Sequence, residues 1–107
     1  MKALKFALVL LVILNIFAVV SAEETCAYFF YGEGCPHCGK VKPYIDELNQ
    51  QPEVNIQIFE IYHNRENAVL LNDFYESYNV PANSRGVPTV LINGKYLVGD
   101  DPILDNL

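Results

Sequence analysis

Hydrophobic and polar residues alternate in patterns that predict a strand, a helix and a second strand in the middle of the chain. The continuous apolar and aromatic run at 27–31 is typical of a central strand covered on both faces. From residue 41 to about 50, apolar residues recur at the spacing of an amphipathic helix. Residues 54–58 then alternate between apolar and polar, which indicates a strand nearer a sheet edge. Two strands joined through a helix predict a parallel pair.

The residues that follow predict a second helix and a hairpin. Asn64 can cap this helix, and Pro81 cannot continue it. Two apolar-rich segments at 87–92 and 95–98 flank the dipeptide Asn93-Gly94. Because this dipeptide best tolerates positive φ at both centres of a type I′ turn, the two segments predict an antiparallel hairpin.

One more helix is predicted at the end of the sequence. We expect Asp101 to cap it, with Pro102 in its first turn. Only residues 103–107 follow, so this helix has about one turn and looks truncated. The order of elements is then β-α-β-α-β-β-α, which predicts an α/β fold with a four-stranded mixed sheet.

The first 22 residues have the pattern of a targeting segment. Lys2 and Lys5 form a positively charged start, and an apolar stretch at 6–20 follows. We expect a secretory signal peptide at 1–22. An uncleaved membrane anchor is the alternative, because about 17 apolar residues is the lower limit for crossing a bilayer. In both cases the domain at 23–107 is extracytoplasmic, in the periplasm or at the cell surface, since the lysines stay in the cytoplasm.

Composition and charge restrict the kind of domain that follows the leader. With 51% hydrophobic and 19% charged residues, the chain is globular and not disordered. Its length fits one small domain. From residue 23 onward there are five basic and 13 acidic residues, a net charge of −8. Nucleic acid is therefore excluded as an expected partner, because no basic stripe can follow phosphates.

The chemistry of the domain is carried by the motif Cys35-Pro36-His37-Cys38, which lies between the first strand and the first helix. A cysteine at a helix N-terminus is favoured as a thiolate. Two intervening residues let Cys38 reach Cys35 within one turn, so the pair can exchange disulfides without a cofactor or a metal. A protonated His37 beside Cys35 would stabilise the thiolate further and shift the pair towards an oxidant. The alternative is that His37 points into solvent.

Two separated motifs resemble the thioredoxin superfamily. The first is the stretch 28–48 with its Cys-Pro-His-Cys sequence, in which the Pro-His pair is similar to that of the DsbA-type oxidants. The second is the segment 85–89, which resembles the cis-proline loop of that family and leads into the hairpin. The resemblance implies a thioredoxin-like fold with helices on both faces of the sheet. It also implies a cis peptide between Val87 and Pro88 against the cysteine pair, with the Val87 backbone free to bind an extended substrate.

The sequence also departs from its relatives. DsbA-type enzymes carry a large helical insertion after the second strand, whereas only residues 65–79 stand there in this chain, which is closer to a glutaredoxin-sized core. A narrower set of protein partners is therefore expected. Glutaredoxins bind glutathione partly through two glycines followed by acidic residues. The corresponding stretch at 98–101 has one glycine, so glutathione is unsupported as a partner.

The group that accepts the proton of Cys38 also has to differ from the one that thioredoxins use. Thioredoxins place a buried acid six residues before the first cysteine, and Phe29 stands at that position. Glu33 and Lys40 are close enough in sequence to help with this proton, directly or through water. A solvated surface charge is the alternative role for each of them.

Cys26 is left without a predicted partner. We expect it to be a small core residue at the start of the first strand. The alternatives are a mixed disulfide with a partner protein, or a zinc site together with Cys35, Cys38 and His63. A close pair of cysteines with two distant ligands is a spacing that only weakly indicates a zinc site, so no metal is predicted.

The sequence therefore predicts an extracytoplasmic thiol–disulfide oxidoreductase that exchanges disulfides with protein thiols. Cys35 and Cys38 would be its catalytic cysteines, with Pro36 and His37 between them, and Val87 and Pro88 would dock the substrate. A membrane-embedded electron carrier is one possible redox partner, and the direction of exchange stays open. The alternative is a non-catalytic thioredoxin-like binding module of a membrane redox complex, in which the disulfide is structural.

Overall fold

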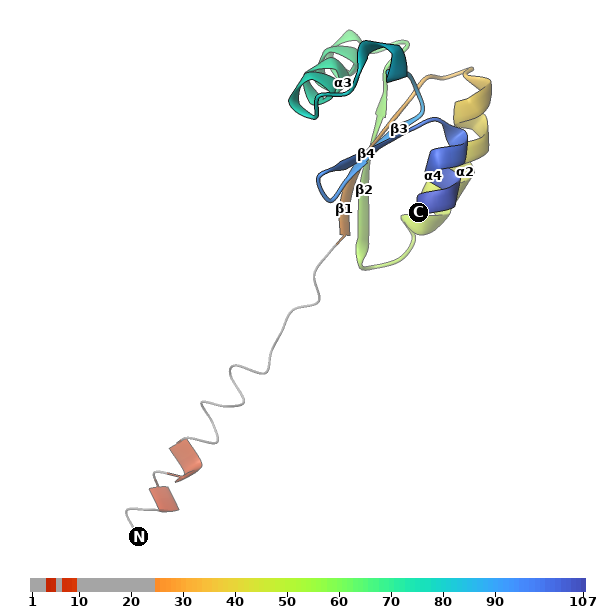
Figure 1. Ribbon diagram of the computed structural model, residues 1–107. Helices are drawn as coiled ribbons and strands as arrows, with labels where there is room; N and C mark the ends of the chain where they lie inside the picture. Colours follow the sequence, from red (N-terminus) through yellow and green to blue (C-terminus); the bar gives the residue numbers. More distant parts are fainter. Residues whose placement is uncertain (1–3, 6, 10–24) are drawn as a thin grey trace.

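The computed structural model describes residues 4–5, 7–9 and 25–107 (Figure 1). Most of the predicted targeting segment at 1–22 lies outside the described residues. No helix in the described part of the chain is long and apolar enough to cross a membrane. From residue 25 the elements are β1 (Thr25–Tyr31), α2 (Pro36–Leu48), β2 (Val54–Glu60), α3 (Arg65–Ser77), a 3₁₀ turn (Ala82–Ser84), β3 (Thr89–Ile92), β4 (Lys95–Val98) and α4 (Asp100–Asn106).

These elements confirm the predicted order and the mixed sheet. The four strands lie in the order β2-β1-β3-β4. β1 is parallel to β2, with Tyr31 opposite Glu60, and antiparallel to β3, with Phe30 opposite Thr89. β3 and β4 form the predicted hairpin, in which Asn93 has a φ of 51°. The parallel pair and the hairpin thus share one sheet, with β1 at its centre.

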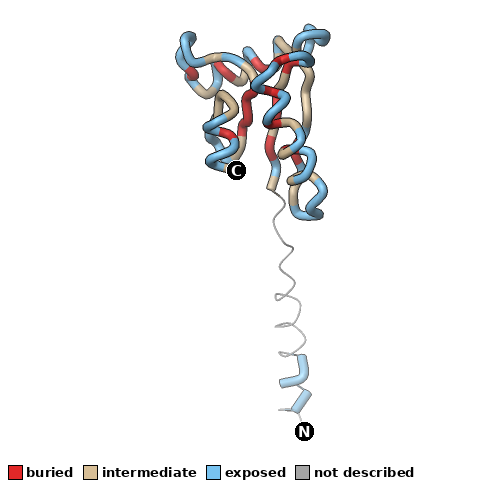
Figure 2. The backbone as a smooth tube through the Cα atoms, turned by 90° about the vertical axis from the view of Figure 1, so that its right-hand side faces the viewer, coloured by how far each residue is buried: buried red, intermediate tan, exposed pale blue. Residues whose placement is uncertain are grey.

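Helices cover both faces of the sheet, as Figure 1 shows, with α3 on one face and α2 and α4 on the other. β1 is covered on both sides because its alternate residues point into two different cores. Phe29 lies in the core beneath α2 and α4, and Phe30 lies in the core beneath α3. Both phenylalanines are completely buried. The buried residues gather in the middle of the domain, and exposed segments lie on its outside (Figure 2).

The last helix is short, as the sequence predicts, and spans seven residues. It contributes Ile103, which is completely buried against α2 and the sheet. A cavity of about 240 Å³ lies on the same face, at the end of the sheet away from the start of α2. It is lined by Thr25, Ala27, Leu48, Val54, Ile56, Ile92, Asn106 and Leu107.

Two predictions about single residues are wrong. Asp101 does not cap α4, because the helix begins at Asp100 and the residue before it is Gly99, with a φ of 100°. Cys26 is not a core residue but is exposed. It points to the same face of β1 as Phe30, since the two are four residues apart, but it lies at the beginning of the strand, beyond the part of this face that α3 covers.

Candidate functional site

The two cysteines of the motif form a disulfide at the start of α2. Cys35 is the N-cap of the helix, and Pro36 occupies the first helical position, where a missing N–H costs nothing. The Cys38 N–H donates a hydrogen bond to the Cys35 sulfur over 3.2 Å. The Cys35 residue is 9% exposed and Cys38 is 2% exposed, so Cys35 is the more accessible residue of the pair. A helix N-terminus and a backbone donor both favour a thiolate on Cys35.

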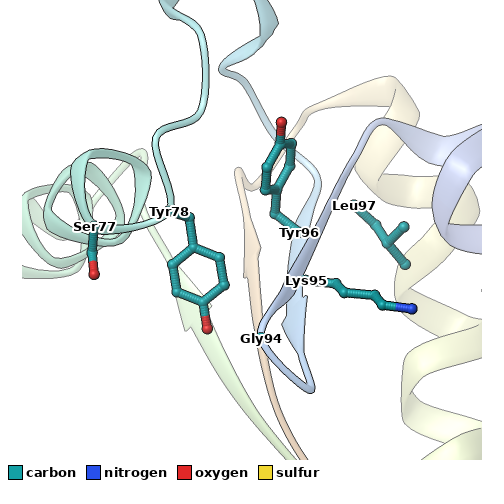
Figure 3. A pocket seen from close by; sticks show the side chains of 6 residues that line it. All are labelled: Ser77, Tyr78, Gly94, Lys95, Tyr96 and Leu97. Carbon is teal, nitrogen blue, oxygen red and sulfur yellow. The ribbon is translucent and has the colours of Figure 1, made fainter.

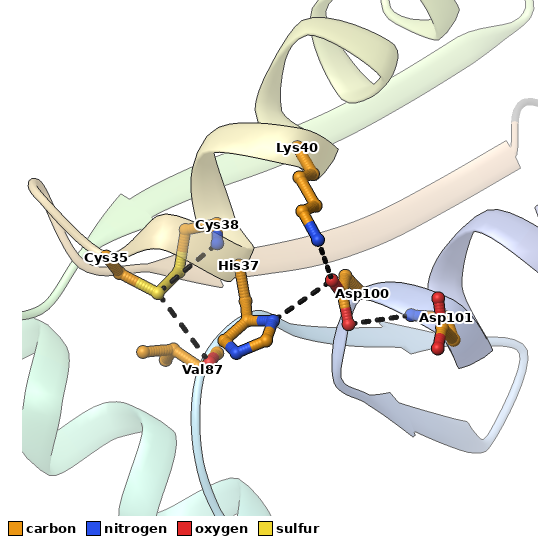
Figure 4. A network of polar contacts seen from close by, with 7 residues as sticks. All are labelled: Cys35, His37, Cys38, Lys40, Val87, Asp100 and Asp101. Atoms are coloured by element: carbon orange, nitrogen blue, oxygen red, sulfur yellow. Dashed lines mark hydrogen bonds and ion pairs between the residues drawn. A yellow bond between two sulfur atoms is a disulfide. The ribbon is translucent and has the colours of Figure 1, made fainter.

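The second predicted motif lies directly against this disulfide. The Val87–Pro88 peptide bond is cis, which confirms the expectation drawn from the resemblance. The carbonyl oxygen of Val87 lies 3.9 Å from the Cys35 sulfur (Figure 4). β3 starts only at Thr89, after the cis-proline, and not at Val87 as the pattern indicates. Two segments 52 residues apart in the sequence therefore form one site.

The cis-proline loop is held by α3 through Tyr75, which is buried. The Tyr75 hydroxyl accepts a hydrogen bond from the Gly86 N–H at 3.1 Å and donates to the Gly86 carbonyl oxygen at 2.5 Å. It also lies 2.7 Å from the hydroxyl of Thr89, the one buried polar residue of the described core. Arg85 lies over the Tyr75 ring and donates to the Val80 carbonyl oxygen. The loop is thus fixed on both sides of Val87.

The loop before Cys35 is held by Glu60, the last residue of β2. The Glu60 carboxylate accepts hydrogen bonds from the backbone N–H groups of Glu33 at 2.9 Å, Tyr62 at 2.9 Å and His63 at 2.7 Å. Partial burial acts to raise the pKa of Glu60, but these three donors and the nearby His63 outweigh it and hold the pKa below its ordinary value. One carboxylate therefore joins the loop after β1 to the loop after β2.

The packing at this junction also explains why residue 32 is a glycine. Gly32 is buried under the ring of Tyr62, and a Cβ at this position would overlap that ring. The Gly32 carbonyl oxygen accepts a hydrogen bond from the Cys35 N–H, which closes the turn into α2. The turn that positions Cys35 is therefore anchored by Glu60 and packed by Tyr62.

His37 lies on the exposed side of the first turn of α2 and contacts the start of α4. Its Nδ1 is 3.0 Å from the Asp100 carboxylate, and Lys40 Nζ lies 3.5 Å from the same oxygen (Figure 4). The hydrogen bond with His37 is the main cause that holds the pKa of Asp100 below its ordinary value, while partial burial opposes it. Within the described residues, the His37 ring forms no hydrogen bond with either cysteine. Neither of the two predicted arrangements of His37 includes this carboxylate.

The structure also shows where Glu33 and Lys40 lie, which could accept the proton of Cys38, and where Phe29 lies, which replaces the buried acid of thioredoxins. Phe29 is buried in the core, and Lys40 is paired with Asp100. The Glu33 side chain is 76% exposed and faces His63 at 4.0 Å. A cavity of about 170 Å³ reaches Cys38 from the surface. Its lining consists of Tyr31, Gly32, Glu33, Gly34, Cys35, Cys38, Gly39 and Lys42. Glu33 therefore lines the same cavity as Cys38, whereas Lys40 does not.

Two wider hollows lie on the surface around α3. One, of about 400 Å³, adjoins the disulfide through Val87 and is lined by Ile61, Tyr62, Ala68, Leu71, Asn72, Tyr75, Arg85, Gly86 and Val87. The other, of about 540 Å³, lies between the end of α3 and the β3–β4 hairpin and includes Tyr78 and Tyr96 (Figure 3). None of the predicted site residues lines the second hollow. Among the described residues, no group of three or more histidine, cysteine or acidic side chains is arranged to hold a metal ion.

A thioredoxin-like sheet with a CXXC disulfide at a helix start and a cis-proline beside it defines the class of thiol–disulfide redox domains. The family model described as glutaredoxin matches residues 25–97. The chain therefore belongs to the glutaredoxin family, within the thioredoxin superfamily that the two motifs indicate. A comparison with curated proteins gives no match.

Solved glutaredoxin structures share the fold. The buckwheat glutaredoxin–glutathione complex is 22% identical, with a TM-score of 0.54 over 76% of this chain and 66% of that one. A mutated buckwheat glutaredoxin gives 22% identity and a TM-score of 0.53 over 74% and 64%. Oxidised glutaredoxin 2 from Chlamydomonas reinhardtii gives 25% identity and a TM-score of 0.50 over 76% and 69%. This chain thus spans about two thirds of the length of these structures.

The role of Tyr75 can be tested by removing its hydroxyl. We expect Tyr75→Phe to lower the free energy of unfolding by about 1–3 kcal/mol, because the Gly86 N–H and the Thr89 hydroxyl lose a buried partner. Urea denaturation measures this change. Tyr78→Phe is the matched control, since the Tyr78 hydroxyl makes no hydrogen bond within the described residues and its loss should cost less than about 0.5 kcal/mol. Equal losses in the two variants would show that Tyr75 is not an anchor.

The role of Glu60 gives a pH-dependent prediction. A carboxyl whose pKa is lowered on folding contributes stability that is complete above its ordinary value of 4.5 and is lost as the pH falls through the lower folded value. We therefore expect Glu60→Gln to be less stable than the native protein at neutral pH, with the difference shrinking in acid. Urea denaturation at several pH values measures it. Glu47→Gln, which changes an exposed acid of α2, should show no such trend, and a similar trend in both variants would contradict the role of Glu60.

Proposed function

We propose that the protein is an extracytoplasmic thiol–disulfide oxidoreductase that exchanges disulfides with protein thiols through Cys35 and Cys38. The position of the Cys35 sulfur is the observation that supports it most. Cys35 is the more exposed residue of the pair, and its sulfur lies at the N-terminus of α2 and faces the Val87 carbonyl oxygen across 3.9 Å. A sulfur in this place is open to attack on one side and stabilised as a leaving group on the other.

The reaction needs no cofactor besides the disulfide. A substrate thiolate attacks the Cys35 sulfur, the Cys35–Cys38 bond breaks, and Cys38 leaves with the electron pair and takes up a proton. The second substrate thiolate then attacks the substrate sulfur of the mixed disulfide, and Cys35 leaves as a thiolate. The substrate has lost two electrons and the cysteine pair has gained two. The same steps in reverse reduce a substrate disulfide.

The remaining site residues would position the two reactants. Pro36 fixes the first turn of α2, and His37 lies on the same turn with its ring directed to Asp100. Val87 and Pro88 form the wall on which the substrate backbone would lie, as in the cis-proline loop that the sequence resembles. The acidic domain and its lack of a basic stripe argue against nucleic acid.

The hollow next to Val87 supports polypeptide substrates. Its walls include Ile61, Leu71 and the ring of Tyr62, which is 57% exposed. We propose that an apolar side chain beside the reacting cysteine of the substrate lies there. Glutathione is named in the buckwheat complex, but it has no apolar side chain to fill this hollow and stays unsupported here.

The location is proposed from the leader. The positively charged start and the apolar stretch at 6–20 favour export of the domain, as a cleaved protein or a tethered one. Outside the cytoplasm, a redox pair needs a partner that resets it. A membrane-embedded electron carrier is the proposed partner, and whether it oxidises or reduces the pair depends on the potential of the pair relative to that of the carrier.

A second candidate function is favoured by the low exposure of the disulfide. Cys35 is 9% exposed and Cys38 is 2% exposed, as a structural disulfide in a binding module would be. The cavity that reaches both cysteines argues for exchange instead. The rate at which dithiothreitol reduces the native disulfide separates the two functions.

Cysteine variants test the proposed function directly. We expect Cys35→Ser to lose disulfide exchange with dithiothreitol and with reduced polypeptides, because the attacked sulfur is gone. We expect Cys38→Ser, mixed with a disulfide-bonded polypeptide, to accumulate a mixed disulfide: the Cys35 thiolate attacks the substrate disulfide, one substrate sulfur leaves as a thiolate, and no second cysteine displaces the bond that forms. Mass spectrometry of alkylated protein detects both outcomes. Retained turnover in Cys35→Ser would overturn the mechanism, and a native disulfide that dithiothreitol does not reduce would favour the binding module.

The proposed binding of a substrate side chain in the hollow next to Val87 can be tested separately. We expect Tyr62→Ala to raise KM for a reduced polypeptide about tenfold, since a partly buried aromatic contact contributes roughly 1.5 kcal/mol, while exchange with dithiothreitol stays unchanged. Tyr96→Ala removes an exposed tyrosine from the other hollow and should change neither value. An equal loss with dithiothreitol in Tyr62→Ala would mean that Tyr62 only supports the loop at Gly32.

A further inference from the structure

Asp100 connects the redox site with the last helix. It is the first residue of α4, and its side chain is 16% exposed. One of its oxygens lies 3.0 Å from His37 Nδ1 and 3.5 Å from Lys40 Nζ. The other accepts a hydrogen bond from the Asp101 N–H at 3.0 Å. Of the three side chains on the first two turns of α2 that can carry a positive charge, His37 and Lys40 are therefore directed to one carboxylate (Figure 4). The third, Lys42, is paired with Asp46 of the same helix.

The backbone fixes this carboxylate relative to the disulfide. The Gly99 N–H donates a hydrogen bond to the carbonyl oxygen of Pro88 at 2.9 Å. Gly99 has a φ of 100°, a conformation that favours glycine, and it turns the chain directly into α4. Asp100 thus follows a residue bonded to the cis-proline itself, so its position depends on the same loop that faces Cys35.

We propose that Asp100 is a positioning residue that lowers the reduction potential of the Cys35–Cys38 pair by holding His37 and Lys40 away from the Cys35 sulfur. This proposal rests on the proposed function. A cation beside Cys35 stabilises the thiolate of the reduced form and makes the pair a stronger oxidant. The Asp100 charge offsets the charges of His37 and Lys40 and directs the His37 ring to α4. The reduced form then loses stabilisation relative to the disulfide.

The ionisation of Asp100 supports this geometry. The pKa of its carboxyl is lowered first by the hydrogen bond with His37 and further by the Asp101 N–H and the charges of His37 and Lys40, against an opposing effect of partial burial. Asp100 is therefore negatively charged at neutral pH, where disulfide exchange takes place. As a consequence, His37 of the Cys-Pro-His-Cys motif acts together with a carboxylate that lies 63 positions further along the sequence.

The test compares four variants of the full chain with the native protein: Asp100→Asn, Asp101→Asn, His37→Ala, and His37→Ala combined with Asp100→Asn. Each is equilibrated with glutathione redox buffers at pH 7, and the fraction of reduced protein is read from the mass of alkylated thiols. The pH dependence of Cys35 alkylation is measured in parallel. Thermal unfolding of each variant shows whether it is folded.

We expect Asp100→Asn to favour the reduced form about tenfold, which is about 30 mV for a two-electron couple, and to shift Cys35 alkylation to lower pH. Asp101→Asn, the neighbouring exposed acid on the same helix, should leave both values unchanged. In the His37→Ala background, Asp100→Asn should have less than half of its effect, because the main contact through which it acts is gone.

Three results would overturn the proposal: an unchanged or lower potential in folded Asp100→Asn, an equal shift in Asp101→Asn, or full additivity with His37→Ala. A purely structural role would lower the unfolding temperature without moving the potential. Failure of the proposed function is distinguishable, because then the native disulfide would not titrate at all. A native pair that titrates beside an unresponsive Asp100→Asn would overturn only the role of Asp100.

Discussion

The burial of β1 on both of its faces is the constraint on which the rest of the structure depends. Phe29 and Phe30 point to opposite faces and are completely buried, so β1 can only be a central strand with helices above and below it. Its position fixes its two neighbours, with Tyr31 beside Glu60 of β2 and Phe30 beside Thr89 of β3. The loop to Cys35 and the cis-proline loop therefore meet at one end of the sheet.

Three polar side chains then fix the loops at this end. Glu60 joins the loop before Cys35 to the loop after β2, and Tyr75 holds the loop that carries the cis-proline. Asp100 binds the first turns of α2 from the start of α4. Each of the three comes from a different element and reaches a different side of the disulfide. The small domain thus has a rigid frame around two sulfur atoms without the large insertion of the DsbA-type oxidants.

Much of this architecture could be predicted from local sequence patterns. The apolar run of β1, the Asn64 cap and the Asn93-Gly94 turn each identify an element, because the physical preference involved acts over a few residues. The spacing of the cysteine pair likewise identifies the redox motif. The cis peptide before Pro88 followed only from the resemblance to a family, since most bonds before proline are trans.

The contacts that hold the site could not be predicted in this way. Glu60, Tyr75 and Asp100 act on residues that are 27, 11 and 63 positions away in the sequence, and an isolated polar residue has no periodicity that marks its partner. The exposure of Cys26 could not be predicted from the sequence either. The alternation of a strand tells which face a residue points to, but not how far a helix extends over that face.

The reduction potential of the native Cys35–Cys38 pair is the most direct test of this account, because one titration reports both the exchange and its electrostatic setting. The full chain is equilibrated against glutathione and dithiothreitol buffers, and alkylated thiols are counted by mass. We predict a single two-electron transition at a potential clearly below the ~−120 mV of DsbA-type oxidants, since a carboxylate holds the histidine of the motif. A pair that does not titrate would contradict the account, because Cys35 and Cys38 would then form a structural disulfide.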